Sequence, residues 1–130
     1  TLNVNIANIN NSSVEKFMIE VECPNGVFTN NVSGSYTKLG NVHFLTVLQG
    51  VLISGTPGAR FVLYIPQNIP LPEYFISYFG PVIDYNPSNA VRPSVIRVNP
   101  VNHSLLVFGV NSNFSSDPIG FTPFQITYVL

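Results

Sequence analysis

The sequence predicts an all-β protein, an antiparallel β-sandwich with jelly-roll-like connections, from three observations. Strong helix formers are scarce, with three Ala, two Lys and three Gln, while Val, Ile, Phe, Tyr and Thr are abundant. Apolar and polar residues alternate over many short segments, which is the period of a strand with one buried face. Clusters rich in Asn, Ser, Pro and Gly separate these segments at regular short intervals.

Length and charge limit the architecture and the classes of partner. The 130 residues fit one domain, so we expect a single domain over residues 1–130. Charged residues make up 8% and the formal net charge is −1, too little positive charge for a nucleic-acid-binding surface. No apolar run reaches the length of a transmembrane helix, so we expect no membrane insertion.

About eight to ten short strands are expected in chain order. The first two cover residues 2–6 and 17–21, where apolar and polar residues alternate, and a short one follows the turn Pro24-Asn25-Gly26. The remaining predicted strands cover residues 42–53, 61–65, 74–78, 82–85, 91–98, 105–110 and 124–130.

The longest predicted strand, residues 42–53, is apolar on both of its faces. A strand in a lone sandwich needs a polar outer face. Residues 42–53 therefore lie either beneath a covering loop or against another subunit. Residues 105–108 form a second apolar run of this kind.

Residues 66–81 contain four prolines, so we expect a long excursion with only a short strand in it. This region and its continuation to residue 89 are rich in tyrosine. Tyrosine gives a large contact area with few torsions to freeze, and aromatic rings beside carboxylates suit a sugar or a protein partner. Tyr74, Tyr78, Asp84 and Tyr85 are therefore the candidate receptor-binding residues. The alternative is that these rings pack in the core or between subunits.

Catalytic and metal-binding constellations are weak. His43 and His103 are the only histidines, Cys23 is the only cysteine, and the spacing of the carboxylates does not suggest metal ligands. No Gly-x-Ser-x-Gly nucleophile motif occurs. Glu73 and Asp84 do not establish the separation that a glycosidase pair needs. We therefore expect no enzyme activity, no cofactor and no metal, and we interpret Cys23 as a core residue.

Two segments carry a resemblance to a known family. The segment Gly34-Ser35-Tyr36-Thr37-Lys38-Leu39-Gly40-Asn41-Val42, followed by an apolar strand and Ser54-Gly55-Thr56, resembles a pattern of the C-terminal head domains of phage tail fibres and related viral fibres. The aromatic final strand, residues 124–130, is also similar to the last strand of such heads. In the residues themselves, Gly34 and Gly40 permit a tight corner.

The resemblance implies a trimeric β-sandwich knob on the virion surface that attaches the particle to a host receptor, either a glycan or a protein. The apolar strand faces described above also favour a homotrimer. Two alternatives stay open: a capsid-associated jelly-roll domain, and a lectin-like carbohydrate-binding or carbohydrate-active domain.

Overall fold

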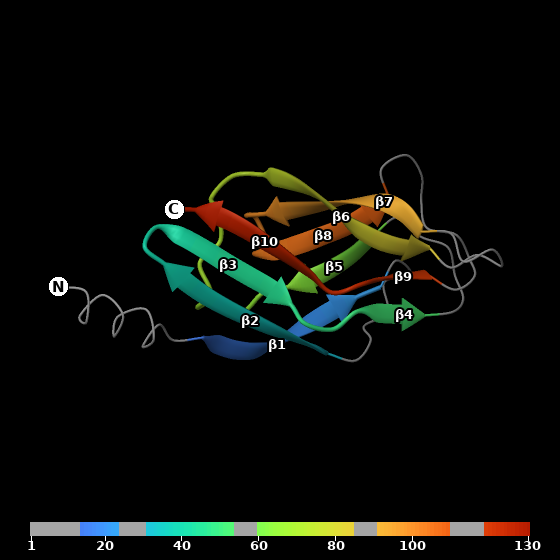
Figure 1. Ribbon diagram of the computed structural model, residues 1–130, viewed down its shortest axis with the longest axis horizontal. Helices are drawn as coiled ribbons and strands as arrows, with labels where there is room; N and C mark the ends of the chain where they lie inside the picture. Colours follow the sequence, from blue (N-terminus) through green and yellow to red (C-terminus); the bar gives the residue numbers. More distant parts are fainter. Residues whose placement is uncertain (1–13, 24–30, 54–59, 85–90, 110–118) are drawn as a thin grey trace, which may run out of the picture.

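Ten antiparallel β-strands make up the part of the chain that the computed structural model describes, residues 14–23, 31–53, 60–84, 91–109 and 119–130. This part contains no helix, which confirms the predicted all-β class. The strands are β1 (Glu15–Glu22), β2 (Val32–Leu39), β3 (Val42–Val47), β4 (Val51–Ile53), β5 (Arg60–Tyr64), β6 (Ile76–Asp84), β7 (Val91–Asn99), β8 (Ser104–Gly109), β9 (Ile119–Phe121) and β10 (Phe124–Val129) (Figure 1). The predicted strand over residues 2–6 and the one after Gly26 lie outside the described residues.

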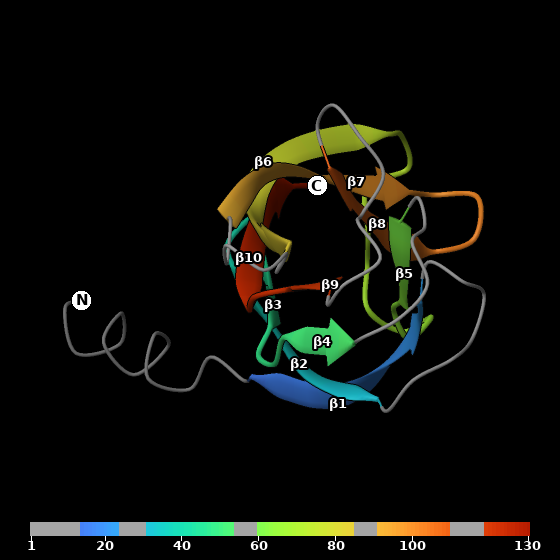
Figure 2. The ribbon, with the colours of Figure 1, turned by 90° about the vertical axis from the view of Figure 1, so that its right-hand side faces the viewer.

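The strands form one sheet in the order β10-β3-β2-β1-β5-β8-β7-β6-β9-β4. This sheet curls until it nearly closes, so that β6 comes beside β10 (Figure 2). β1 joins the two halves: residues 15–19 pair with β2, and residues 20–22 pair with β5. β6 pairs with β7 over residues 76–83, and its other edge pairs with β9 only over residues 82–84. The two halves of this nearly closed barrel correspond to the two layers of the predicted sandwich.

The predicted strand over residues 42–53 is two strands in the structure, which corrects the sequence analysis. β3 pairs with β2 and β10, whereas β4 pairs with β9. The break falls at residues 48–50, where Gly50 lies so close to the carbonyl oxygen of Phe121 that a Cβ would collide with it. The chain therefore leaves one half of the barrel and joins the other at this glycine.

The predicted strands over residues 74–78 and 82–85 are one strand, β6, which corrects the sequence analysis. It runs for nine residues through Pro81, which lies opposite Pro93 of β7. Proline can occupy a strand position whose N–H would not be used in the ladder. Because Pro81 and Pro93 face each other, neither proline leaves an N–H of its partner's position unpaired. The irregular excursion is consequently limited to residues 65–75.

The inner face of the barrel holds one hydrophobic core with contributions from both halves. Its largest fully buried side chains include Phe61, Ile19, Leu45 and Ile126. Cys23 is 3% exposed and belongs to this cluster, which confirms its prediction as a core residue. Along β10, buried and exposed residues alternate strictly, so the period-2 pattern read from the sequence is the pattern of burial.

The proline-rich segment after β5 closes one end of the barrel. Ile65, Ile69 and Leu71 are buried in the core cluster. The Nε2 of His103 lies 3.0 Å from the Pro66 carbonyl oxygen and 2.8 Å from that of Ile69, so a protonated Nε2 donates to both. His103 itself has a positive φ of 55°, the left-handed region that a turn between β7 and β8 uses. Residues 65–71 thus cover this end of the barrel, and we call them the plug.

The motif around residues 34–42 is a β-hairpin. Leu39 pairs with Val42, which leaves Gly40 and Asn41 as a two-residue turn, and Gly40 has a φ of 63°. A glycine at the first position of such a turn is typical of type II′. Gly34 lies within β2 opposite Phe17, where an added Cβ would come within 2.7 Å of the Phe17 ring. Of the two glycines expected at a corner, only Gly40 forms one.

Three rings stack beside this hairpin. The ring centroids of His43 and Tyr128 are 5.2 Å apart with an interplanar angle of 4°, and those of His43 and Tyr36 are 5.8 Å apart. The Tyr36 hydroxyl lies 2.7 Å from Nδ1 of His43. Burial lowers the pKa of His43, and the neighbouring charge of Lys38 lowers it further. His43 is therefore held as a neutral imidazole.

Substituting Gly50 with Ala should lower the free energy of unfolding by about 3 kcal/mol or more, because the new Cβ collides with backbone and not with a flexible side chain. Gly40→Ala is the matched control. Its Cβ would meet nothing within 4 Å, so only the left-handed backbone costs about 1–2 kcal/mol. Urea unfolding followed by circular dichroism measures both. A Gly50→Ala protein as stable as the wild type would contradict the close approach.

His43 should make the protein less stable as pH falls below about 7. Its folded-state pKa lies below the ordinary 6.5. As pH falls, the unfolded chain therefore binds the proton first, and this binding stabilises the unfolded state relative to the folded one. In His43→Gln this part of the pH dependence should disappear, leaving a shallower loss between pH 7 and 5. Thermal or urea unfolding across that range provides the measurement. Equal slopes for the two proteins would show that His43 does not carry the effect.

Candidate functional site

The four predicted receptor-binding residues fall in different settings. Tyr74 precedes β6 and is 61% exposed. Tyr78 lies within β6 and is partly buried against the core. Asp84 ends β6, but its side chain lies outside the described residues, as does the whole of Tyr85. The structure therefore describes only Tyr74 and Tyr78 as side chains of this predicted site.

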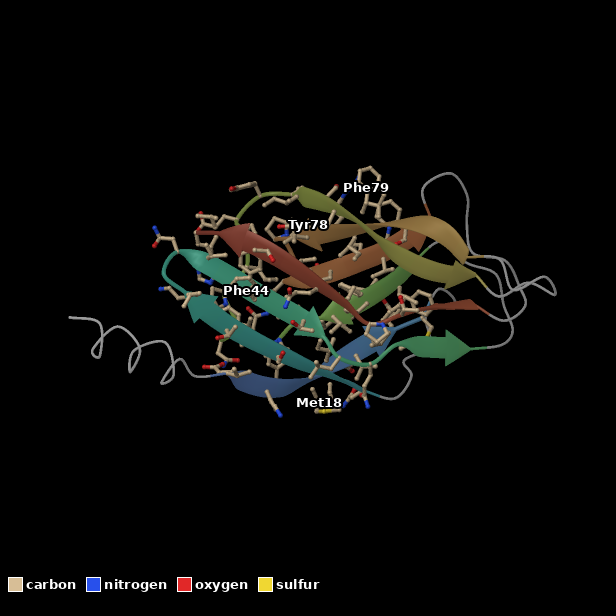
Figure 3. The ribbon with its side chains drawn as sticks, viewed as in Figure 1. Met18, Phe44, Tyr78 and Phe79 are labelled. Carbon is tan, nitrogen blue, oxygen red and sulfur yellow. The ribbon has the colours of Figure 1, made fainter. Side chains whose placement is uncertain are left out.

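Tyr78 links the two strands that meet where the barrel nearly closes. Its hydroxyl donates a hydrogen bond of 3.0 Å to the backbone carbonyl of Thr127 in β10. Figure 3 shows this side chain beside β10, on the side of β6 away from Phe79. Burial raises the pKa of Tyr78, and the nearby Tyr74 raises it further. The described geometry thus gives Tyr78 a structural role, which is the packing alternative that the sequence left open.

The outward side of β6 is aromatic. Successive residues of a strand point to opposite faces, so Ser77 and Phe79 line the outside when Tyr78 points in, and Phe75 directly precedes the strand. Phe79 is 87% exposed and Phe75 is 57% exposed, and Figure 3 shows Phe79 projecting away from the ribbon. The sequence favours core or subunit packing for these phenylalanines; in the structure neither is in the core, and packing between subunits stays a prediction.

Arg97 of β7 lies next to these rings and is held in place by two neighbours. Its Nε donates a hydrogen bond of 3.2 Å to the Ser77 hydroxyl, the residue directly opposite it on β6. On its other side, the guanidinium carbon lies 5.2 Å from the centroid of the Phe108 ring, a cation–π contact. Within the described ranges, Arg97 forms no ion pair with a carboxylate.

We define the arginine face as the outward residues Phe79, Val95, Arg97, Leu106 and Phe108 on β6, β7 and β8. The register places Val95 opposite Phe79 and Phe108, and Leu106 opposite Arg97. All five are at least partly exposed. Apart from its arginine, and the outward Ser77 opposite that arginine, the face is apolar. The sequence does not reveal this face, because its members come from three strands and a single sequence does not show how the strands pair. The concentration of aromatic residues in 75–79 is the signal that the sequence does contain.

A second surface feature lies on the other half of the barrel. A depression of about 350 Å³ is lined by Lys16, Phe17, Met18, Ser33, Gly34 and Leu48. Met18 is 52% exposed and points away from the ribbon (Figure 3). The backbone N–H of Ser33 donates a hydrogen bond of 2.8 Å to the side-chain oxygen of Gln49.

The described residues offer little for metal or acid–base chemistry. They contain no group of three or more His, Cys, Asp or Glu side chains placed to hold a metal ion. Both histidines are engaged, His43 with Tyr36 and His103 with the carbonyls of the plug.

No helix within the described ranges is long and apolar enough to span a membrane.

Comparison with known proteins identifies a structural neighbour and no sequence relative. No protein-family model matches the chain. No curated protein matches it. The structure is similar to the crystal structure of the T1L reovirus attachment protein sigma1 in complex with alpha-2,3-sialyllactose, with a TM-score of 0.53 and 14% sequence identity.

That match covers 89% of this chain and 64% of the sigma1 chain, so this chain spans less than two thirds of the length of its neighbour. At 14% identity the likeness concerns the fold. The chain therefore has an all-β fold similar to that of a viral attachment protein, in agreement with the family resemblance of residues 34–42 and 124–130.

Replacing Tyr78 by Phe should lower the free energy of unfolding by about 0.5–1.5 kcal/mol, because it removes the hydrogen bond to Thr127 and leaves that carbonyl without this donor. Tyr74→Phe is the control: this ring is 61% exposed, and the same hydroxyl deletion there should change stability by less than about 0.5 kcal/mol. Chemical denaturation of the three proteins decides the matter. Identical effects of the two substitutions would argue against a closing role for Tyr78.

Proposed function

We propose that this chain is the head of a viral or phage fibre that forms a homotrimer and attaches the particle to a host-surface receptor, a glycan or a protein. The observation that carries the proposal is the similarity of fold to a viral attachment protein. That protein was crystallised with a sialylated glycan, which supports a glycan as one receptor class. In this proposal the head is displayed on the virion surface, binds without catalysis and needs no cofactor.

The segments that resemble fibre heads lie together in the structure, which supports the proposal. Residues 34–42 form most of the β2–β3 hairpin. The final strand, β10, pairs with β3 over six residues, from Phe124 opposite Val47 to Val129 opposite Val42. Two stretches that are about 80 residues apart in the sequence thus form one three-stranded unit, as expected if they are parts of a single family motif.

Trimerisation draws support from apolar groups on the outside of this unit. Leu39, Val129 and Leu130 are 52%, 62% and 48% exposed, and Val42 and Phe44 on β3 are partly exposed. Exposed apolar side chains gain roughly 1.5–3 kcal/mol each when they are fully buried. A ring of three copies is a means of burying them, and the low content of charged residues, 8%, limits the repulsion between copies.

The test of assembly is sedimentation equilibrium at micromolar concentration, which should give about three times the chain mass of 14.3 kDa. Val129→Lys should shift the protein towards monomer by placing an ammonium in the contact. The control is Lys16→Glu on β1, which changes the charge on a different strand. Thr127→Lys, on the same strand as Val129, is not used as the control because the Thr127 carbonyl accepts the hydrogen bond from Tyr78. A wild-type protein that stays monomeric would contradict the trimer.

The test of attachment uses fluorescently labelled protein on a panel of cultured cells. Saturable binding is expected on at least one cell type, with loss after glycosidase or periodate treatment for a glycan receptor and after protease treatment for a protein receptor. Binding to no cell type, or binding that does not saturate, would contradict the attachment function.

A further inference from the structure

We propose that the arginine face binds an acidic sugar, with Arg97 pairing with the carboxylate of the ligand and Phe79 stacking on its ring. The proposal rests on the attachment function proposed above and names its ligand class and binding residues. None of the four receptor-binding residues predicted from the sequence belongs to this face.

Arg97 is prepared to bind an anion. A guanidinium has five N–H donors in a planar fork, and the Ser77 hydroxyl occupies the one on Nε. The Phe108 ring fixes the plane from one side. The two terminal nitrogens form no ion pair with any described carboxylate, and they have the geometry that accepts a carboxylate through two parallel hydrogen bonds. Little side-chain entropy remains to be lost when a ligand binds.

The charge around Arg97 favours an anionic ligand. Arg60, which lies on β5 opposite Phe108, adds a second positive charge next to the face. Among the described acidic residues, Glu20 and Glu22 are on β1, which is separated from β7 by β5 and β8, and Glu73 lies in the segment before β6, four residues from Ser77. Glu22 also accepts a hydrogen bond from Tyr64. The five residues of the arginine face thus include one positive charge and no carboxylate.

The apolar part of the face favours a sugar ring as the carrier of the carboxylate. A pyranose has an apolar C–H side that stacks on an aromatic ring and hydroxyl groups around its edge. Phe79 is 87% exposed and lies diagonally across the ladder from Arg97, because Ser77 is the residue opposite Arg97. Diagonal pairs are about 7–8 Å apart, a distance that one six-membered ring and its carboxylate span. An acidic peptide would bring several charges to a face that offers Arg97 at its centre and apolar groups around it.

The experiment is a glycan array in which each carboxylated oligosaccharide, sialylated or uronic-acid-containing, is printed beside its neutral counterpart. The wild-type protein should bind at least one carboxylated member and bind its neutral counterpart at least tenfold more weakly. Arg97→Gln should weaken binding of that glycan about tenfold or more, and Phe79→Ala should weaken it without removing the preference for the acid. Titration by surface plasmon resonance quantifies both effects.

Lys38→Gln is the matched control, because it removes one positive charge from an exposed site on β2, in the other half of the barrel, and should leave binding within about twofold of the wild type. Thermal melting of each variant separates lost contacts from lost structure. Equal binding of acidic and neutral glycans, or Arg97→Gln behaving like Lys38→Gln, overturns the proposal.

The cell-attachment assay separates this inference from the attachment function. Saturable attachment that protease abolishes, together with no binding to any carboxylated glycan, refutes the acidic-sugar site and leaves attachment standing. Failure of both the cell assay and the array refutes both.

Discussion

The arrangement of this protein depends on closing a single sheet over its own apolar face. A ten-stranded sheet with one apolar side has to cover that side, and no helix is present in the described ranges to do so. The sheet therefore curls, with β1 joining its two halves by pairing first with β2 and then with β5. Where β6 meets β10, the hydrogen bond from Tyr78 to Thr127 links them. In β10, closure turns every second residue inwards and presents the others to solvent.

The same constraint explains why so many polar and aromatic groups of this chain serve structure. An open barrel end exposes the core, and the segment from Ile65 to Leu71 covers it. Its carbonyls would be costly to bury unpaired. His103 satisfies two of them, and the Tyr128 hydroxyl donates to the Pro70 carbonyl at 2.5 Å. Burial accordingly raises the pKa of Tyr128, which keeps its hydroxyl protonated as a donor. Residues that could pass for ligands in the sequence thus have internal partners.

Much of the fold could be predicted from local patterns, and the misses have a common cause. Alternation along β1 and β10 marks strands because one face of each is buried in the barrel. The break between β3 and β4 depends on Gly50 passing the backbone at Phe121, and β9 is a strand because it lies between β6 and β4. β6 continues through Pro81 because Pro93 faces it across the ladder. Each of these is a contact between residues distant in the sequence.

For the candidate site, the sequence by itself determined that aromatic residues concentrate in residues 74–79 and that they alternate between two sides of a strand. It could not determine which side faces the core, and shifting that choice by one residue exchanges every side chain. The tertiary structure decided it: the closing contact with β10 takes Tyr78 inwards and leaves Phe79 outside. Strand register likewise brought Arg97 to Ser77, 20 residues away, and to the Phe108 ring. Register is fixed by burial across the whole sheet, so no local pattern contains it.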